Sequence, residues 1–184
     1  DARRQPGSSF KPFVYAAALE RGWTPASLVK DEAVRVPLNR NEVWEPQNFD
    51  HKTMGPIRIR TAIALSRNLA AVNMLQSVGL SYATEYVTRF GFDLKSIPLG
   101  LSMVLGTAEV SSLQMAKAYA VFANGGFRIE PYLIQRIETT AGEFVIERCR
   151  LRKRRHPDQQ RQAEALIPAP AQRQSFRQRQ RARR

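Results

Sequence analysis

The chain has 184 residues, of which 43% are hydrophobic and 24% are charged. This composition is typical of a globular domain with a real core, and it excludes a collagenous chain. No stretch approaches the roughly 20 uninterrupted apolar residues that a membrane span requires. One cysteine, Cys149, excludes an internal disulfide, and with only two histidines beside it we expect neither a metal site nor a cofactor.

The net charge of +13 is concentrated at one end of the chain. Residues 1–147 carry 16 Lys/Arg and 14 Asp/Glu, whereas residues 148–184 carry 13 and 2. Such a tail binds polyanions non-specifically, but its single aromatic residue, Phe176, offers no stacking surface for nucleic-acid recognition. We therefore expect no specific nucleic-acid partner. We predict a partial folded domain over 1–147 and a disordered Arg/Gln-rich tail over 148–184, whose abrupt composition suggests a frameshift.

The folded part begins with a predicted helix over residues 10–21, with Pro12 in its first turn and Gly22 after its end. The proline-containing stretch 23–56 is expected to be loop with short extended pieces such as 33–36. Further helices are predicted over 57–65, 69–78, 82–89 with Ser81 as cap, and 113–123 with Ser111 or Ser112 as cap. Strands are predicted over 133–138 and 143–147, joined by a turn at 139–142. Helices followed by antiparallel strands predict an α+β fold.

The first candidate catalytic pair is Ser8 and Lys11, at the start of the first helix. A serine hydroxyl needs a base to become a nucleophile, and a lysine three residues on can lie on the same face of a helix. Burial lowers a lysine pKa toward the range in which the amine accepts a proton. The spacing alone is weak evidence, because Ser27 and Lys30 repeat it; we interpret Ser27 as a turn residue after Pro25.

The second candidate element is the tripeptide Ser66-Arg67-Asn68, which interrupts two helical runs 58 residues after Ser8. A serine hydroxyl can relay a proton toward a lysine, and an asparagine amide can both orient a substrate carbonyl and hold the lysine. Arg67, in the middle position, receives no role. Alone, the tripeptide is better explained as a helix junction. Together with Ser-x-x-Lys it opens the motif set of penicillin-binding proteins and serine β-lactamases.

Further segments around these two motifs carry a family resemblance: Arg4-Gln5-Pro6-Gly7-Ser8-Ser9-Phe10-Lys11-Pro12-Phe13, Trp44-Glu45-Pro46-Gln47-Asn48, Gly55-Pro56-Ile57-Arg58-Ile59-Arg60, Ser66-Arg67-Asn68, Tyr86-Val87-Thr88-Arg89-Phe90-Gly91-Phe92, Leu113-Gln114-Met115-Ala116 and Tyr119-Ala120-Val121-Phe122-Ala123-Asn124-Gly125-Gly126. On these segments the chain resembles class A (bifunctional) penicillin-binding proteins of Gram-negative type over about residues 3–147. The resemblance implies their transpeptidase fold, of the serine β-lactamase type, here truncated to the helical part and the first strands.

The resemblance implies a D,D-transpeptidase that crosslinks peptidoglycan stem peptides. Ser8 would attack the D-Ala-D-Ala carbonyl and form an acyl-enzyme, with Lys11 as base, Ser66 as proton relay and Asn68 orienting the substrate amide. β-Lactams would acylate the same serine. The resemblance also implies a location at the periplasmic face of the inner membrane, through an N-terminal anchor that these residues do not include, so we expect a piece of a larger protein.

The family's third motif, Lys-Thr-Gly, does not occur in these 184 residues; the nearest string is Lys52-Thr53-Met54. In the family that motif lies on a strand that binds the substrate carboxylate and supplies an oxyanion-hole donor, and one such donor is worth roughly 10²–10³ in rate. Two alternatives therefore stay open. One is a catalytically inactive remnant of such an enzyme, and the other is a β-lactamase or penicillin-sensor relative.

Overall fold

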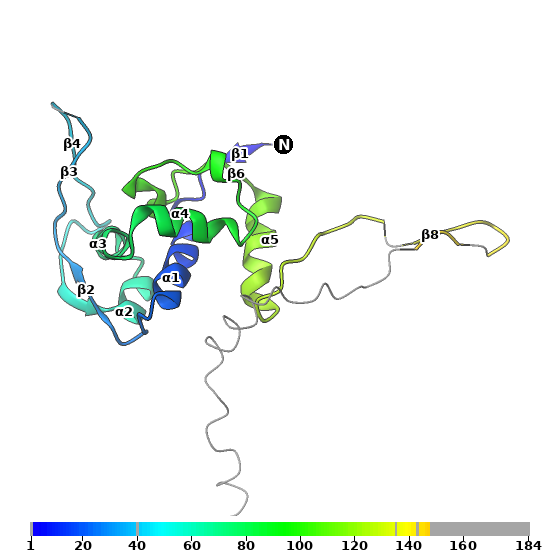
Figure 1. The fold of residues 1–184 in the computed structure, drawn as a ribbon, viewed down its shortest axis with the longest axis horizontal. Helices are drawn as coiled ribbons and strands as arrows, with labels where there is room; N and C mark the ends of the chain where they lie inside the picture. The colour runs from blue at the N-terminus through cyan, green and yellow to red at the C-terminus, as the bar shows by residue number, and fades with distance from the viewer. Residues whose placement is uncertain (1, 40, 135, 143, 148–184) are drawn as a thin grey trace, which may run out of the picture. The chain divides into compact units, whose positions relative to one another are not determined.

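The computed structural model describes residues 2–39, 41–134, 136–142 and 144–147, so the predicted tail at 148–184 lies outside the described residues. The chain forms two units, residues 1–119 and 120–184. The first unit contains the helices α1 (Lys11–Glu20), α2 (Ile59–Ala64), α3 (Asn68–Val78) and α4 (Leu80–Thr88) (Figure 1). Its described residues also form six short strands, β1 (Arg3–Arg4), β2 (Leu28–Asp31), β3 (Val36–Pro37), β4 (Val43–Trp44), β5 (Gly55–Arg58) and β6 (Val110–Ser111).

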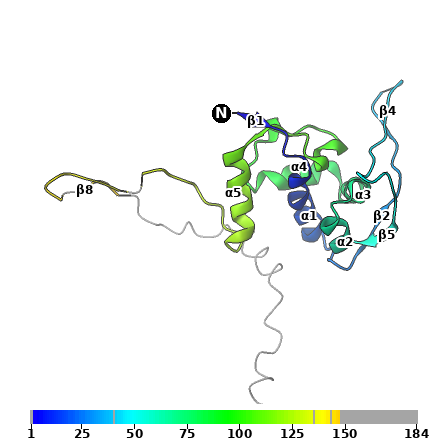
Figure 2. The same cartoon turned by 180° about the vertical axis from the view of Figure 1, so that it is seen from behind.

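Helix α1 lies at the centre of the first unit and contacts α2, α3 and α4 (Figures 1 and 2). Its sequence is apolar on every side, which is the pattern of a helix buried all round. Phe13 makes edge-to-face contacts with Phe90 and Phe92, each at 5.0 Å between ring centroids, and Phe10 lies 5.1 Å from Phe92. These aromatic contacts fix the helix that carries Lys11 in the core of the unit.

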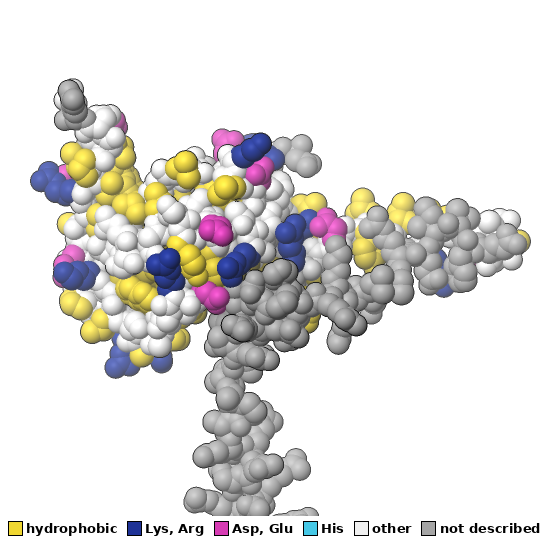
Figure 3. Space-filling model, viewed as in Figure 1, with side chains coloured by type: hydrophobic (Ala, Val, Ile, Leu, Met, Phe, Trp, Pro, Cys, Tyr) yellow, Lys and Arg dark blue, Asp and Glu magenta, His cyan; other side chains and the backbone are white. Residues whose placement is uncertain are grey.

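The short strands pair antiparallel as β1 with β6, β2 with β5 and β3 with β4. The β3–β4 hairpin extends away from the helices and carries apolar side chains on its surface (Figures 1 and 3). Leu38 and Val43 are exposed, whereas Val36 and Trp44 are half-buried. Strand β2 instead contacts α3, with Val29 and Asp31 buried on one side of the strand. The β2–β5 pair therefore packs against α3 through β2.

Helix α5 (Ser112–Ala123) leads from the first unit into the second. Its start is a capping box, because Ser111 Oγ accepts from the N–H of Gln114 at 3.2 Å and Gln114 Oε1 accepts from the N–H of Ser111 at 2.9 Å. In the second unit, β7 (Arg136–Glu138) pairs antiparallel with β8 (Phe144–Glu147). The turn predicted at 139–142 joins these two strands.

Four local predictions are wrong. The strand predicted over 133–138 begins only at Arg136, where its pairing with β8 starts. The predicted helix over 57–65 begins only at Ile59, because residues 55–58 pair with β2 as a strand. Ser81 lies inside α4, since Gly79 occupies the N-cap position. The extended piece expected at 33–36 is a strand only from Val36 onward. In each case a strand pairing or a glycine turn moves the start of the element by a few residues from the position that local sequence signals indicate.

None of the helices in the described residues combines the length and the apolar character needed to cross a lipid bilayer.

Candidate active site

Ser8 lies in η1 (Gly7–Phe10), a single 3₁₀ turn that runs directly into α1. Side chains three residues apart eclipse one another in a 3₁₀ helix, so Ser8 and Lys11 share one side of the chain. The N–H of Lys11 donates to the carbonyl of Ser8, which closes this turn. Ser8 is exposed, and among the described residues its Oγ makes no hydrogen bond to protein. The candidate nucleophile is therefore accessible.

A close backbone contact holds the turn that carries Ser8. Gly7 has φ +58° and its N–H donates to the carbonyl of Gly106 at 3.2 Å. Gly106 has φ +76°, and a β-carbon there would collide with the backbone of Gly7. Both positions thus require glycine, Gly106 for its conformation and for the close approach.

Lys11 is buried, with 1% of its surface exposed, and its amine has three oxygen partners. Nζ donates to the carbonyl of Ser66 at 2.6 Å, to Asn68 Oδ1 at 2.6 Å and to Ser66 Oγ at 3.1 Å. These partners lie 55 and 57 residues away in sequence. The structure therefore brings Lys11, Ser66 and Asn68, three of the four predicted site residues, into direct contact, with Ser8 one turn before Lys11.

Burial lowers the pKa of Lys11 from 10.5 to about 8. Because desolvation disfavours the charged amine, the neutral form becomes accessible near neutral pH. With a pKa of about 8, about a tenth of the molecules carry a neutral Lys11 at pH 7, against roughly 0.03% for an unperturbed lysine. At pH 7 the neutral fraction of Lys11 is thus about a few hundred times larger than that of an unperturbed lysine in water.

Ser66 connects α2 to α3 in a left-handed conformation, with φ +53°. A residue with a β-carbon is uncommon there, and such conformations concentrate at functional sites. The conformation lets both the carbonyl and the hydroxyl of Ser66 meet Lys11 Nζ. Asn68 is the first residue of α3, and its Nδ2 donates to the carbonyl of Gln47 at 2.8 Å, which leaves Oδ1 for Lys11.

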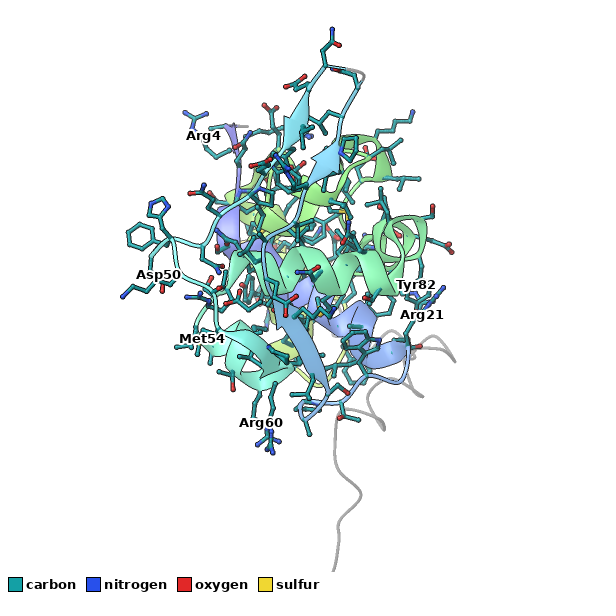
Figure 4. All side chains as sticks on the ribbon, turned by 90° about the vertical axis from the view of Figure 1, so that its left-hand side faces the viewer. Arg4, Arg21, Asp50, Met54, Arg60 and Tyr82 are labelled. Carbon is teal, nitrogen blue, oxygen red and sulfur yellow. The ribbon has the colours of Figure 1, made fainter. Side chains whose placement is uncertain are left out.

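Arg67 turns away from Lys11 and is buried in an ionic cluster. Its Nε donates to Asp31 Oδ2 at 2.9 Å, Nη1 donates to Asp50 Oδ2 at 2.8 Å, and Nη2 contacts the carbonyl of Lys52. Asp31 is fully buried, whereas Asp50 lies with Met54 on the loop between β4 and β5 (Figure 4). The Arg67 guanidinium lowers the pKa of the Asp50 carboxyl. The middle residue of the tripeptide therefore anchors it to β2 and to this loop.

Sequence reasoning missed three residues that support the site, namely Asp31, Asn48 and Arg67. Asn48 belonged to a segment of family resemblance but received no role, and Asp31 was not singled out. They lie on a strand end, in a loop and in a tripeptide that carry no periodic pattern, so no local signal joins them. The second Ser-x-x-Lys is a turn as predicted: Ser27 Oγ accepts from the N–H of Thr24 at 2.9 Å, and Lys30 is an exposed residue of β2.

A cavity of about 460 Å³ lies elsewhere on the first unit. Its walls include Arg3, Asp93, Lys95, Thr107 and Glu109, two cations and two carboxylates among them. None of the four candidate site residues lines it. The candidate site is therefore defined by the contacts around Lys11 and not by this cavity.

Comparison with known proteins gives consistent matches. The family described as "Penicillin binding protein transpeptidase domain" matches residues 1–173. Penicillin-binding protein 1A of Pseudomonas aeruginosa is 46% identical over 147 residues, which are 79% of this chain and 18% of that protein. Penicillin-binding protein 1A of Neisseria lactamica is 43% identical over 145 residues, 78% of this chain and 18% of that protein. The chain thus spans about a fifth of the length of these curated relatives.

Solved structures agree on the fold. The crystal structure of penicillin-binding protein 1A from Haemophilus influenzae superimposes with a TM-score of 0.76 at 38% identity, covering 79% of this chain and 22% of that one. Penicillin-binding protein A of M. tuberculosis, in its imipenem acyl-enzyme complex, gives a TM-score of 0.74 at 22% identity, covering 89% of this chain and 42% of that one. The second likeness shows the fold alone. These matches confirm the predicted resemblance and the α+β fold class.

Proposed function

Because the chain belongs to the penicillin-binding protein transpeptidase family, we propose that it carries the serine acylation chemistry of a D,D-transpeptidase, with Ser8 as nucleophile. The observation that supports this most directly is the buried Lys11 amine, which contacts Ser66 and Asn68 one turn after an exposed Ser8. The substrate class is the D-Ala-D-Ala end of a peptidoglycan stem peptide, and β-lactams react at the same serine. We assign the residue roles in three steps, each supported by the contacts around Lys11.

The first step is the preparation of the base. A neutral amine has two N–H groups and one lone pair. The two contacts at 2.6 Å, to the carbonyl of Ser66 and to Asn68 Oδ1, use the two N–H groups. The lone pair then faces Ser66 Oγ, the partner at 3.1 Å, whose hydroxyl can donate as well as accept. Deprotonation of Lys11 thus leaves both short hydrogen bonds intact.

The second step is acylation. Ser66 Oγ passes its proton to Lys11 Nζ and takes the proton of Ser8 Oγ, while Ser8 Oγ bonds to the substrate carbonyl carbon. The scissile C–N bond breaks, and the proton held by Lys11 passes to the leaving amine of D-Ala. Asn68 orients the substrate amide through its side chain at the start of α3.

The third step forms the crosslink. An amine of a neighbouring stem peptide attacks the ester carbon and gives up one proton to Lys11, and the bond to Ser8 Oγ breaks. The proton then passes from Lys11 through Ser66 Oγ to Ser8 Oγ. With a β-lactam the leaving amine stays tethered to the acyl group, so the adduct persists. We place this chemistry at the periplasmic face of the inner membrane, where stem peptides are crosslinked.

The test is covalent labelling of the purified chain with a fluorescent penicillin, followed by intact mass. Ser8→Ala removes the nucleophile, and Ser9→Ala is the matched control, because Ser9 is the exposed neighbour whose Oγ donates to the carbonyl of Pro6. We expect an adduct on the parent chain and on Ser9→Ala but none on Ser8→Ala. An adduct that persists in Ser8→Ala refutes the assigned nucleophile.

A catalytically inactive chain is the second candidate, and the missing Lys-Thr-Gly motif favours it. Without that motif, these 184 residues do not supply the oxyanion donor and the carboxylate-binding group that the family takes from it. In that case a sample shown to be folded by circular dichroism gives no adduct at all. Hydrolysis of a chromogenic cephalosporin with repeated turnover would instead indicate a β-lactamase relative.

A further inference from the structure

Asn48 lies in the loop between β4 and β5 and is buried, with 3% of its surface exposed. Its Nδ2 donates to Asp31 Oδ1 and to the carbonyl of Lys52, each at 2.9 Å. Its Oδ1 accepts from the backbone N–H of Asn68 at 2.7 Å and of Leu69 at 3.1 Å. Both donors and both acceptor positions of this amide are therefore used.

These bonds make Asn48 the cap of helix α3. The first turn of a helix has free N–H groups, which the residue preceding the helix usually satisfies with its own side chain. That residue here is Arg67, which makes no capping hydrogen bond. Asn48 supplies the missing acceptor from 20 residues away in sequence.

The cap acts on the group that contacts Lys11. The N–H of Asn68 is held by Asn48 Oδ1, and the side chain of the same Asn68 contacts Lys11 Nζ at 2.6 Å. Asp31 holds Asn48 and Arg67 in place, because one of its carboxylate oxygens accepts from Asn48 and the other accepts from Arg67. The oxygens that face Lys11 Nζ belong to uncharged groups of Ser66 and Asn68. The charged groups of the neighbouring cluster, Asp31, Asp50 and Arg67, pair with one another.

We propose that Asn48 is a positioning residue for acylation, which fixes Asn68 Oδ1 on the Lys11 amine through the backbone of α3. This inference rests on the proposed function, since it assigns Asn48 to the same site. Without the cap the first turn of α3 frays, Asn68 leaves Lys11, and water reaches the amine. Lys11 then binds its proton more tightly, and the neutral base becomes scarcer.

The test compares Asn48→Ala with Asn73→Ala in the full 184-residue chain. Asn73 is a matched control because its Nδ2 also ties α3 to the β2 region, donating to the carbonyls of Lys30 at 3.0 Å and Glu32 at 3.2 Å, but not at the helix start. The first measurement is the titration midpoint of Lys11, from its rate of reductive methylation against pH. The second is the rate of penicillin labelling against pH.

We expect Asn48→Ala to raise the midpoint of the Lys11 titration by about one pH unit, which lowers the neutral fraction, and with it the labelling rate at pH 7, about tenfold. Asn73→Ala should leave the midpoint where it is in the parent chain. An unchanged midpoint in Asn48→Ala overturns the proposal, and so does an equal shift in both variants, because a general loosening of α3 would then explain it. If the parent chain is not labelled at all, the proposed function fails while the midpoints still decide the role of Asn48.

A paired exchange covers the case in which Asn48→Ala does not fold. Asn48→Asp alone keeps the acceptor for α3, but it sets two carboxylates against each other and loses the bond to the Lys52 carbonyl. Asp31→Asn combined with Asn48→Asp restores a donor opposite an acceptor between these two positions and leaves an amide oxygen to accept from Arg67. We expect the double variant to recover the parental midpoint of Lys11 at least in part and to exceed Asn48→Asp in labelling rate. Equal midpoints and rates in the single and double variants would overturn the proposal.

Discussion

Replacing Lys11 with Met should change how the stability of the chain depends on pH. Lys11 is 1% exposed and burial lowers its pKa from 10.5 to about 8. A difference of about 2.5 pKa units between the unfolded and folded states corresponds to about 3 kcal/mol. That cost is fully present below pH 8, where the folded chain must bury a protonated amine, and it vanishes above pH 10.5.

The sign follows from the protons that each state binds. Between pH 8 and 10.5 the unfolded chain keeps the proton on Lys11 and the folded chain does not, so the free energy of unfolding rises with pH. Of the cost of about 3 kcal/mol, about 2 kcal/mol should be relieved between pH 7 and 9.5, so the free energy of unfolding rises by that amount. Burial raises the pKa values of Tyr15 and Tyr86, so ionisation of these residues in the unfolded state lowers stability above about pH 10. The free energy of unfolding of the parent chain, plotted against pH, should therefore have a maximum near pH 10.

The assay is urea unfolding at half-unit steps of pH from 7 to 11, on the parent chain and on Lys11→Met. The parent should gain about 2 kcal/mol between pH 7 and 9.5, and the variant should not. Both should lose stability above pH 10, because the tyrosines are unchanged. If the free energy of unfolding changes in parallel for the two proteins between pH 7 and 9.5, the pKa of Lys11 is not lowered in the folded chain. The proposed acylation step would then lose its proton acceptor.

Three further substitutions test the frame around the site. Gly106→Ala should lower the free energy of unfolding by about 2 kcal/mol and slow the labelling of Ser8, because the added β-carbon collides with the backbone of Gly7. The control is Gly22→Ala, which is also at positive φ but has open space around it. It should lower the free energy of unfolding by less and leave the labelling rate unchanged. Arg67→Met should cost about 3–5 kcal/mol in urea unfolding, since it leaves the fully buried Asp31 without its cation. Ser66→Gly should raise the free energy of unfolding by up to about 1 kcal/mol, by relieving the left-handed conformation, while labelling falls about tenfold without the relay hydroxyl.

Much of the fold was predictable because its signals are local. The apolar runs that form α1, α3 and α5 are bounded by glycines, prolines and serines that mark helix ends, so the predicted spans match to within one or two residues. The boundary of α2 failed because residues 55–58 are held as a strand by β2, a pairing between segments far apart in the chain. Local patterns do not encode such pairings.

In the candidate site, too, contacts between residues close in sequence were predictable and contacts between distant residues were not. Ser8 and Lys11 are three residues apart, and helix geometry alone predicts that they lie on one side of the chain. Nothing in composition or periodicity links Lys11 to Ser66, 55 residues on; only the family resemblance set these residues together. The left-handed backbone of Ser66 was also out of reach, because serine carries no signal for positive φ.

The Ser66-Arg67-Asn68 turn shows why its middle position is constrained in this chain. Ser66 and Asn68 contact Lys11, while Arg67 points the other way and pairs with Asp31, so one short turn contacts the Lys11 amine on one side and a buried carboxylate on the other. A buried carboxylate at position 31 requires a donor at position 67, because an unpaired buried charge costs several kcal/mol. It follows that an apolar residue at 67 is compatible with the fold when residue 31 is uncharged as well. Arg67→Met combined with Asp31→Leu should therefore regain most of the stability that Arg67→Met alone loses, and failure to regain it would mean that the pair is not an independent unit.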